Sequence, residues 1–164
     1  MTLFENTLRD AAAERARRLA GQNLLTRDGA TLETNAMGIM RWYLHPDLDG
    51  PSTKSLYCHE LEIPVGSKTG RLQCQGGVLH YVLEGEGYTD LDGVHHEWGA
   101  GDVIAIPIKE LGVSYQHINT GAQAVRMLVV RPNFDSALGP EAGVEMKMLE
   151  DSPDFLAARE QGAG

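Results

Sequence analysis

Short apolar segments that end in glycine-rich turns recur between residues 56 and 132, and this pattern most constrains the fold. The stretch Gly70–Gly87 shows it most clearly. Gln75-Gly76-Gly77 supplies a tight turn, because glycine adopts positive φ at no steric cost. The apolar run Val78–Leu83 is typical of a buried strand. We therefore expect Arg71–Cys74 and Val78–Leu83 to form a hairpin.

The other elements follow at short, even intervals without an internal repeat or a domain break. We expect a helix over Leu3–Ala20 that packs on the barrel or on a partner subunit, a loop over Asn23–Asn35, and strands over Met37–Leu44, Leu56–Ile63, Tyr88–Leu91, Val94–Trp98, Val103–Pro107, Gly112–Ile118 and Val125–Arg131. After Pro132 we expect no further clear strand, and a frayed end over Ala157–Gly164. Many short, evenly spaced strands indicate one β-barrel or jelly-roll domain.

Charge and composition exclude several classes of partner. The chain of 164 residues has a net charge of −9 and a pI near 5.0, which argues against nucleic acid as a partner. It has no apolar run long enough to span a bilayer, and its first residues lack the pattern of a signal peptide. Two cysteines make no disulfide framework, so we expect a cytoplasmic protein with reduced thiols.

Strand alternation predicts which side chains face the interior. In Leu56–Ile63, His59 shares a face with the apolar residues, whereas Cys58, Glu60 and Glu62 share the other, which we expect to be solvent-exposed. The same parity places Leu72, Cys74, Val78, His80 and Val82 on the inner face, with Tyr115 and His117 on the facing strand. A single buried histidine is commonly structural, but convergence of His59, Cys74, His80, Tyr115 and His117 favours a functional pocket.

The motifs Tyr-Val-Leu-Glu-Gly-Glu-Gly at 81–87, Asp92-Gly93, Trp98-Gly99-Ala100-Gly101-Asp102 and Ile106-Pro107 resemble those of the cupin superfamily. The resemblance covers roughly Leu56 to Pro132 and is closest to the cupin type-2 barrels of the gentisate-dioxygenase-like branch. It implies an all-β fold, the cupin double-stranded β-helix or jelly-roll barrel, here with an N-terminal helix. On this basis the chain is one cupin domain with a helix in 1–22, a barrel in 37–132 and a C-terminal extension in 133–164. The resemblance also implies a homodimer.

The same resemblance locates the usual metal ligands of that branch, and here they are replaced. A pair of histidines before Gln-Gly-Gly would fall on Leu72 and Cys74, and a third histidine would fall on Tyr115. A fourth ligand would fall on Val78 or Leu79. Because none of these positions carries histidine, we expect a degenerate metal site and no metal cofactor.

The predicted function is that of a small-molecule cupin enzyme without a metal. It would use acid–base chemistry of the lyase, isomerase, dehydratase or cyclase type on a carbonyl or phenolic substrate. The predicted catalytic residues are His80, Tyr115 and His117, with one histidine as general base and activity falling as pH drops through ~6.5. The predicted substrate-binding residues are Trp42, His59, Leu72, Cys74 and Val78.

Two alternatives remain open at this stage. The first is a metal-dependent, dioxygenase-like cupin that holds iron, zinc or manganese through His59, His80 and His117, with Cys74 or Tyr115. The second is a cupin that binds or senses a small molecule without catalysis.

Overall fold

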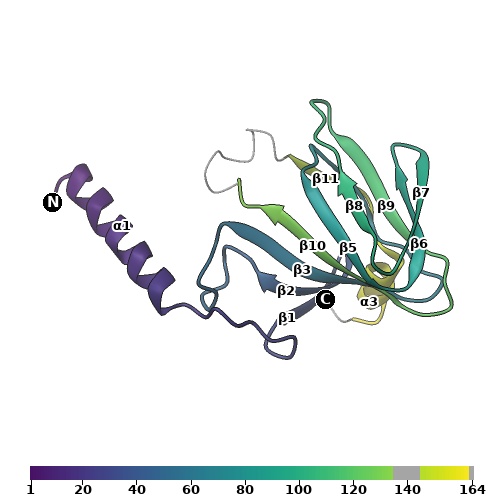
Figure 1. The fold of residues 1–164 in the computed structure, drawn as a ribbon, viewed down its shortest axis with the longest axis horizontal. Coiled ribbons are helices and arrows are strands. Elements are labelled where there is room, and N and C mark those ends of the chain that lie inside the picture. Colours follow the sequence, from purple (N-terminus) through teal and green to yellow (C-terminus); the bar gives the residue numbers. More distant parts are fainter. Residues whose placement is uncertain (135–144, 163–164) are drawn as a thin grey trace.

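Two antiparallel sheets face each other and enclose the core of the protein (Figure 1). The structure is a computed structural model, and it describes residues 1–134 and 145–162. One sheet has six strands in the order β1 (Thr31–Asn35), β2 (Gly38–Leu44), β3 (Leu56–Ile63), β10 (Val125–Pro132), β5 (Val78–Glu84) and β8 (Val103–Ile106). The other has five, in the order β11 (Met146–Glu150), β4 (Arg71–Cys74), β9 (Val113–Asn119), β6 (Glu86–Leu91) and β7 (Val94–Gly99). The predicted jelly-roll architecture is confirmed.

The core forms between the sheets because the strands alternate between inward apolar and outward side chains. In β5, Val78, His80 and Val82 are buried whereas Leu79, Tyr81 and Leu83 are exposed. The buried apolar side chains are Met40, Leu61, Ile63, Leu72, Cys74, Val78, Val82, Trp98, Ile106, Val113, Tyr115, Val125, Met127 and Val129. The inward parity predicted from the sequence is therefore confirmed for these strands.

The predicted hairpin between Arg71–Cys74 and Val78–Leu83 is wrong. β4 pairs with β9 and β11, whereas β5 pairs with β10 and β8, so the two strands belong to opposite sheets. Both Gly76 and Gly77 have positive φ, and the amide of Gly77 donates to the carbonyl of Ile106 at 3.0 Å. A Cβ on Gly76 would collide with the carbonyl of Pro107. This turn therefore carries the chain across the barrel, because it packs against the β8–β9 loop.

Three regular elements lie where the sequence predicts none. β1 pairs with β2 within the segment expected to be a loop over Asn23–Asn35. β11 pairs with β4 beyond Pro132, and the helix α3 (Pro153–Glu160) follows it. Ser152 caps α3 by accepting a hydrogen bond from the amide of Phe155 at 3.2 Å. Residues 157–160 belong to this helix, so the fraying predicted for them is wrong. The last two residues of that prediction lie outside the described residues.

The helix α1 (Leu3–Ala20) forms as predicted but does not pack on its own barrel. It extends away from the sheets (Figure 1), and none of its residues is buried. Thr2 and Glu5 form a capping box at its start. Arg17 holds its end, because the guanidinium donates to the carbonyl of Pro51 at 2.9 Å. We predicted that this helix packs either on the barrel or on a partner subunit, and the first of these two positions is wrong.

The outward face of β3 is not simply exposed to solvent, which corrects a further prediction. Glu60 is buried, with 3% of its surface exposed, because its carboxylate accepts two hydrogen bonds from Arg126 at 3.0 and 2.8 Å. Arg27 adds a third at 3.2 Å. These bonds, first of all those from Arg126, lower the pKa of Glu60 to about 2. The network fastens β3 to β10 on the outside of the barrel.

Candidate functional site

A cavity of about 330 Å³ opens between the two sheets, and most of its wall is apolar. Its size lies at the lower end of the range for small-molecule sites. The lining side chains come from both sheets and from the turn before β2. They are Asn35, Ala36, Met37, Met40, Trp42, His59, Leu61, Leu72, Val78, His80, Tyr115, Val129, Arg131, Met146 and Met148.

His80, Tyr115 and His117 form one aromatic cluster at this cavity. The rings of His80 and His117 lie 4.5 Å apart between centroids, and each lies 5.4 Å from the ring of Tyr115. His80 and Tyr115 line the cavity, whereas His117 is fully buried beside them and is not among the lining residues. The structure therefore brings the three predicted catalytic residues together, with two of them facing the cavity.

A chain of hydrogen bonds fixes the ring of His117. The indole N–H of Trp98 donates to Thr89 Oγ1 at 2.9 Å, and Thr89 Oγ1 lies 2.8 Å from His117 Nδ1. The indole can only donate, so Thr89 Oγ1 accepts from Trp98, and the same hydroxyl is the hydrogen-bond partner of His117 Nδ1. The other ring nitrogen of His117, Nε2, is buried without a hydrogen-bond partner.

Burial keeps these groups neutral near pH 7. It lowers the pKa of His117 to about 3, and it lowers that of His80 well below the ordinary histidine value, with His117 and His59 adding smaller contributions. Burial also raises the pKa of the Tyr115 phenol. The cavity therefore has a neutral imidazole, able to accept a proton, next to a neutral phenol, able to donate a hydrogen bond.

A second aromatic cluster lies at another part of the cavity wall. Trp42 on β2 lies 4.4 Å from His59 on β3, and both line the cavity. The guanidinium of Arg131 lies over the ring of Tyr57 at 3.6 Å. Burial lowers the pKa of His59 to about 3, with smaller contributions from Arg131 and His45.

The remaining predicted substrate-binding residues separate into two groups. Leu72 and Val78 line the cavity together with Trp42 and His59. Cys74 is buried but does not line this cavity; it contributes instead to a separate pocket beside the β8–β9 loop. Burial raises the pKa of its thiol, so it stays protonated near neutral pH.

Sequence reasoning missed much of the cavity wall. Four methionines line it, two near β2 and two on the unpredicted strand β11: Met37, Met40, Met146 and Met148. Methionine side chains adapt to irregular ligand shapes. The alternation Met-Lys-Met-Leu-Glu in β11 is a strand signal, but it is only five residues long. Arg131 was also missed as a lining residue.

The three histidines do not form a metal site as they stand. Within residues 1–134 and 145–162, no group of three or more His, Cys, Asp or Glu side chains is arranged to hold a metal ion. His59, His80 and His117 each have one ring nitrogen that is buried without a partner, but the three rings belong to two clusters. The rings of these three histidines therefore do not converge on one point in the structure.

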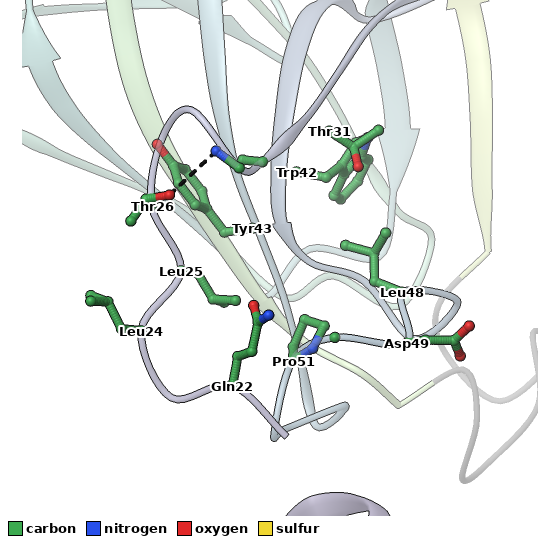
Figure 2. Close-up of a pocket in the computed structure, with 13 residues that line it drawn as sticks. Gln22, Leu24, Leu25, Thr26, Thr31, Trp42, Tyr43, Leu48, Asp49 and Pro51 are labelled. Atoms are coloured by element: carbon green, nitrogen blue, oxygen red, sulfur yellow. Dashed lines mark hydrogen bonds between the residues drawn. The ribbon is translucent and has the colours of Figure 1, made fainter. Parts of the chain in front are cut away.

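A second, smaller pocket of about 190 Å³ lies outside the barrel, between the segment that follows α1 and the β2–β3 loop (Figure 2). Thr26 shapes its rim by accepting a hydrogen bond from the amide of Gly29 at 3.3 Å. Its ionisable lining groups are Asp49 and Tyr43. It offers no imidazole paired with a phenol, so the barrel cavity is the better candidate site.

Comparison with known proteins agrees with this fold. Residues 59–131 match the family model described as "Cupin domain". A 5-aminosalicylate 1,2-dioxygenase from Comamonas sp is 29% identical over 70 residues, which are 43% of this chain and 19% of that enzyme. The chain thus matches about a fifth of the length of this curated relative. No helix in the described part of the chain is long and apolar enough to cross a membrane.

Two solved structures share the architecture. The polyketide cyclase RemF from Streptomyces resistomycificus has a TM-score of 0.58 at 20% identity, covering 85% of this chain and 93% of that one. A predicted oxalate decarboxylase from Thermotoga maritima has a TM-score of 0.50 at 24% identity, covering 65% of this chain and 96% of that one. At such identities the likeness shows the fold alone. The matching family model therefore identifies residues 59–131 as a cupin domain, and the solved structures share its fold.

Proposed function

We propose that this cupin is a small-molecule enzyme that transfers protons without a metal, at the wall formed by His80 and Tyr115. The observation that carries the proposal is the edge-to-face pair of buried imidazoles, His80 and His117, with Tyr115 completing the cluster on an otherwise apolar cavity. Buried ionisable groups are costly in an apolar environment, and they concentrate at functional sites.

The proposed mechanism assigns one step to each group. Neutral His80 accepts a proton from a carbon next to a substrate carbonyl, or from a phenolic hydroxyl. The Tyr115 hydroxyl donates a hydrogen bond to the substrate oxygen on which negative charge develops. His117 contacts both rings and positions them, because its own ring is fixed through Thr89. Returning the proton to a different carbon completes an isomerisation, and returning it to a leaving hydroxyl completes a dehydration.

The name of one structural neighbour supports the chemical class. RemF is a polyketide cyclase, and ring closure by an enolate that attacks a carbonyl begins with the same proton abstraction. The dioxygenase and the predicted oxalate decarboxylase are named for other reactions, so the fold does not select one chemistry. The proposal is based on the residues at the cavity, because these differ from the ligand pattern of the metal-dependent branch.

One experiment separates an enzyme from a binding protein. Phenolic and β-hydroxycarbonyl compounds are screened for thermal stabilisation of the protein, and each hit is then incubated in D₂O and followed by NMR. We expect enzyme-dependent deuterium incorporation next to the carbonyl or into product, and its loss in His80→Asn. Binding of hits without exchange or turnover would favour the non-catalytic alternative.

The proposal extends to assembly and location. We propose a homodimer, because α1 exposes Phe4 and Leu8 and does not pack on its own barrel. We also propose a cytoplasmic location, for which Cys58 and Cys74 provide support as free thiols.

A further inference from the structure

Large apolar side chains cover part of the outer face of the six-stranded sheet. Leu79, Tyr81 and Leu83 on β5 point away from the core and are exposed. Val103, on the neighbouring edge strand β8, is exposed as well. A sheet that faces water on its outer side normally carries polar side chains there, because strands alternate between core and solvent. This part of the sheet therefore has the composition of a contact surface.

The strand register aligns these side chains in two apolar rows that cross β10, β5 and β8. In that strand order the rows are Leu128, Tyr81 and Val103, and Val130, Leu79 and Ala105. We name these six residues, together with Leu83, the β5 face. Adjacent strands lie about 4.8 Å apart, so three strands span about 10 Å, which is the diameter of an α-helix. The width of the β5 face therefore suits one helix.

The helix α1 carries an apolar stripe of matching length. Phe4, Leu8 and Ala12 lie four residues apart, which places them on one side of the helix, and all three are exposed. From Phe4 to Ala12 the helix rises about 12 Å. From Leu79 to Leu83 the strand β5 extends about 13 Å. Because α1 projects away from its own barrel (Figure 1), this stripe is available to a second molecule.

We propose that the β5 face binds the first turns of α1 from a second copy of this chain, and that the two copies exchange these helices reciprocally. This inference rests on the proposed homodimer and assigns its interface. Reciprocal exchange covers both unpartnered surfaces, whereas two β5 faces packed against each other would leave α1 exposed. A two-fold axis satisfies both contacts at once and closes the assembly.

Charge favours a copy of this chain as the occupant. α1 has four arginines and three acidic side chains, whereas the whole chain has a net charge of −9. The border of the β5 face is acidic at one end. Glu84 ends β5 with its side chain 55% exposed beside Arg126, and Asp102 is exposed just before β8. Arg15 on α1 is exposed and makes no ion pair among the described residues, so it can meet this border.

The test cross-links one position on each proposed surface. All variants carry Cys58→Ser, because Cys58 is a partly exposed thiol next to the β5 face, whereas Cys74 is buried. Leu8→Cys is co-expressed with a longer, tagged chain that carries Tyr81→Cys, and the purified protein is treated with a bis-maleimide reagent. In the control, the tagged chain carries Val94→Cys, at an exposed apolar residue on β7. Each single-cysteine chain is also treated alone, and circular dichroism melts establish that every variant is folded.

We expect the product that joins Leu8→Cys to Tyr81→Cys to exceed the Val94→Cys control at least about tenfold, because docking holds the two thiols at a high effective concentration. Tyr81→Glu places a charge in the centre of the β5 face. It should weaken dimerisation at least about tenfold in light scattering over a dilution series, whereas Val94→Glu should not. The cross-link decides the question if Tyr81→Glu does not fold.

Two results would overturn the exchange and leave the homodimer standing. One is a cross-link between two Tyr81→Cys chains in place of the mixed product, which would show that the sheet faces pack together. The other is a dimer in light scattering that gives no mixed product above the control. Monomeric wild-type protein would overturn the interface and the homodimer together. The acid–base proposal is tested separately, since deuterium exchange measures the cavity and not this surface.

Discussion

His80 and His117 come from opposite sheets, yet their ring centroids lie 4.5 Å apart in an edge-to-face contact. His80 reaches this position from β5, where it is buried between Ile104 on β8 and Val129 on β10 in the strand register. His117 reaches it from β9, opposite Thr89. The pair joins the two layers beside the cavity, and of the two histidines His80 alone is a lining residue.

This arrangement predicts different effects for the two histidines. His80→Asn should lower kcat by about 10²–10⁴-fold, the usual contribution of a proton-transfer group. His117→Asn should lower both the melting temperature and kcat, because it disturbs the hydrogen bond to Thr89 as well as the ring of His80. Turnover of an identified substrate and thermal melts provide the measurements. The exposed His96 serves as control in His96→Asn; wild-type turnover by His80→Asn would refute the acid–base role.

Tyr115→Phe tests the proposed hydrogen bond to the substrate oxygen. The substitution removes one hydroxyl and keeps the ring that packs against His80 and His117. We expect kcat to fall by about 10²-fold or more and the melting temperature to change little. Tyr88→Phe, on β6 outside the cavity lining, is the matched control. An unchanged kcat in Tyr115→Phe would remove the phenol from the mechanism.

Metal analysis of protein purified without a His tag tests the predicted absence of a cofactor. We expect substoichiometric iron, zinc, manganese, nickel and copper, and no thermal stabilisation by added divalent ions. The reason is that Leu72 and Tyr115, which pair with each other in β4 and β9, occupy positions where ligands would stand. One tightly bound metal per chain that disappears in His80→Ala would support the metal-dependent alternative instead.

The free energy of unfolding should decrease as the pH falls below ~6.5. In the unfolded chain His59, His80 and His117 accept protons near that pH, whereas burial holds the native pKa of His59 and His117 at about 3. The unfolded state then binds more protons, so each histidine costs up to about 1.4 kcal/mol per pH unit in this window. Denaturant melts between pH 8 and pH 4 measure the slope.

His59→Asn supplies the control for this prediction, because it removes one of the three buried imidazoles and should flatten the slope. A free energy of unfolding that stays constant from pH 7 to pH 5 would show that the buried histidines accept protons in the native state. Because we propose His80 as the general base, its depressed pKa predicts that activity falls only at a pH below ~6.5, lower than the sequence alone predicts.

The exposed apolar residues of α1 predict a dimer in solution. Phe4 and Leu8 are 71% and 55% exposed, and the outer face of β5 exposes Leu79 and Tyr81 as well. Light scattering at micromolar concentration should give twice the chain mass of 17.9 kDa. The double variant Phe4→Ser/Leu8→Ser should shift the population toward monomer, with little change in the melting temperature of the barrel. Asp10→Ser on the same helix is the control; a monomeric wild-type protein would contradict the prediction.

The inner face of the barrel was predictable because strand periodicity is local. Alternation alone orients His59, His80 and His117 inward, and burial confirms all three. Which sheet a strand joins depends on distant contacts. The turn at Gly76 looks the same in sequence whether it closes a hairpin or crosses the barrel, and its packing against Pro107 decides between the two.

The cavity wall was less predictable for the same reason. Met146 and Met148 lie on a short strand that is placed by its pairing with β4, a segment more than 70 residues earlier in the chain. Arg131 lies at the end of β10, and its role in the wall depends on Tyr57 across the strand pair. Strand alternation does not predict burial on the outward face. Glu60 points outward and is nevertheless buried, because Arg126 lies beside it and donates to its carboxylate.

The position of β11 has a consequence for how the protein is made. Its two methionines belong to the cavity wall, although they lie next to the last helix in the chain. During synthesis His80 and Tyr115 leave the ribosome well before Met148, so the barrel strands are available while one side of the wall is still missing. The complete wall therefore forms only after β11 has been synthesised and has paired with β4, so the cavity acquires its ligand affinity later than the other barrel strands acquire their sequence.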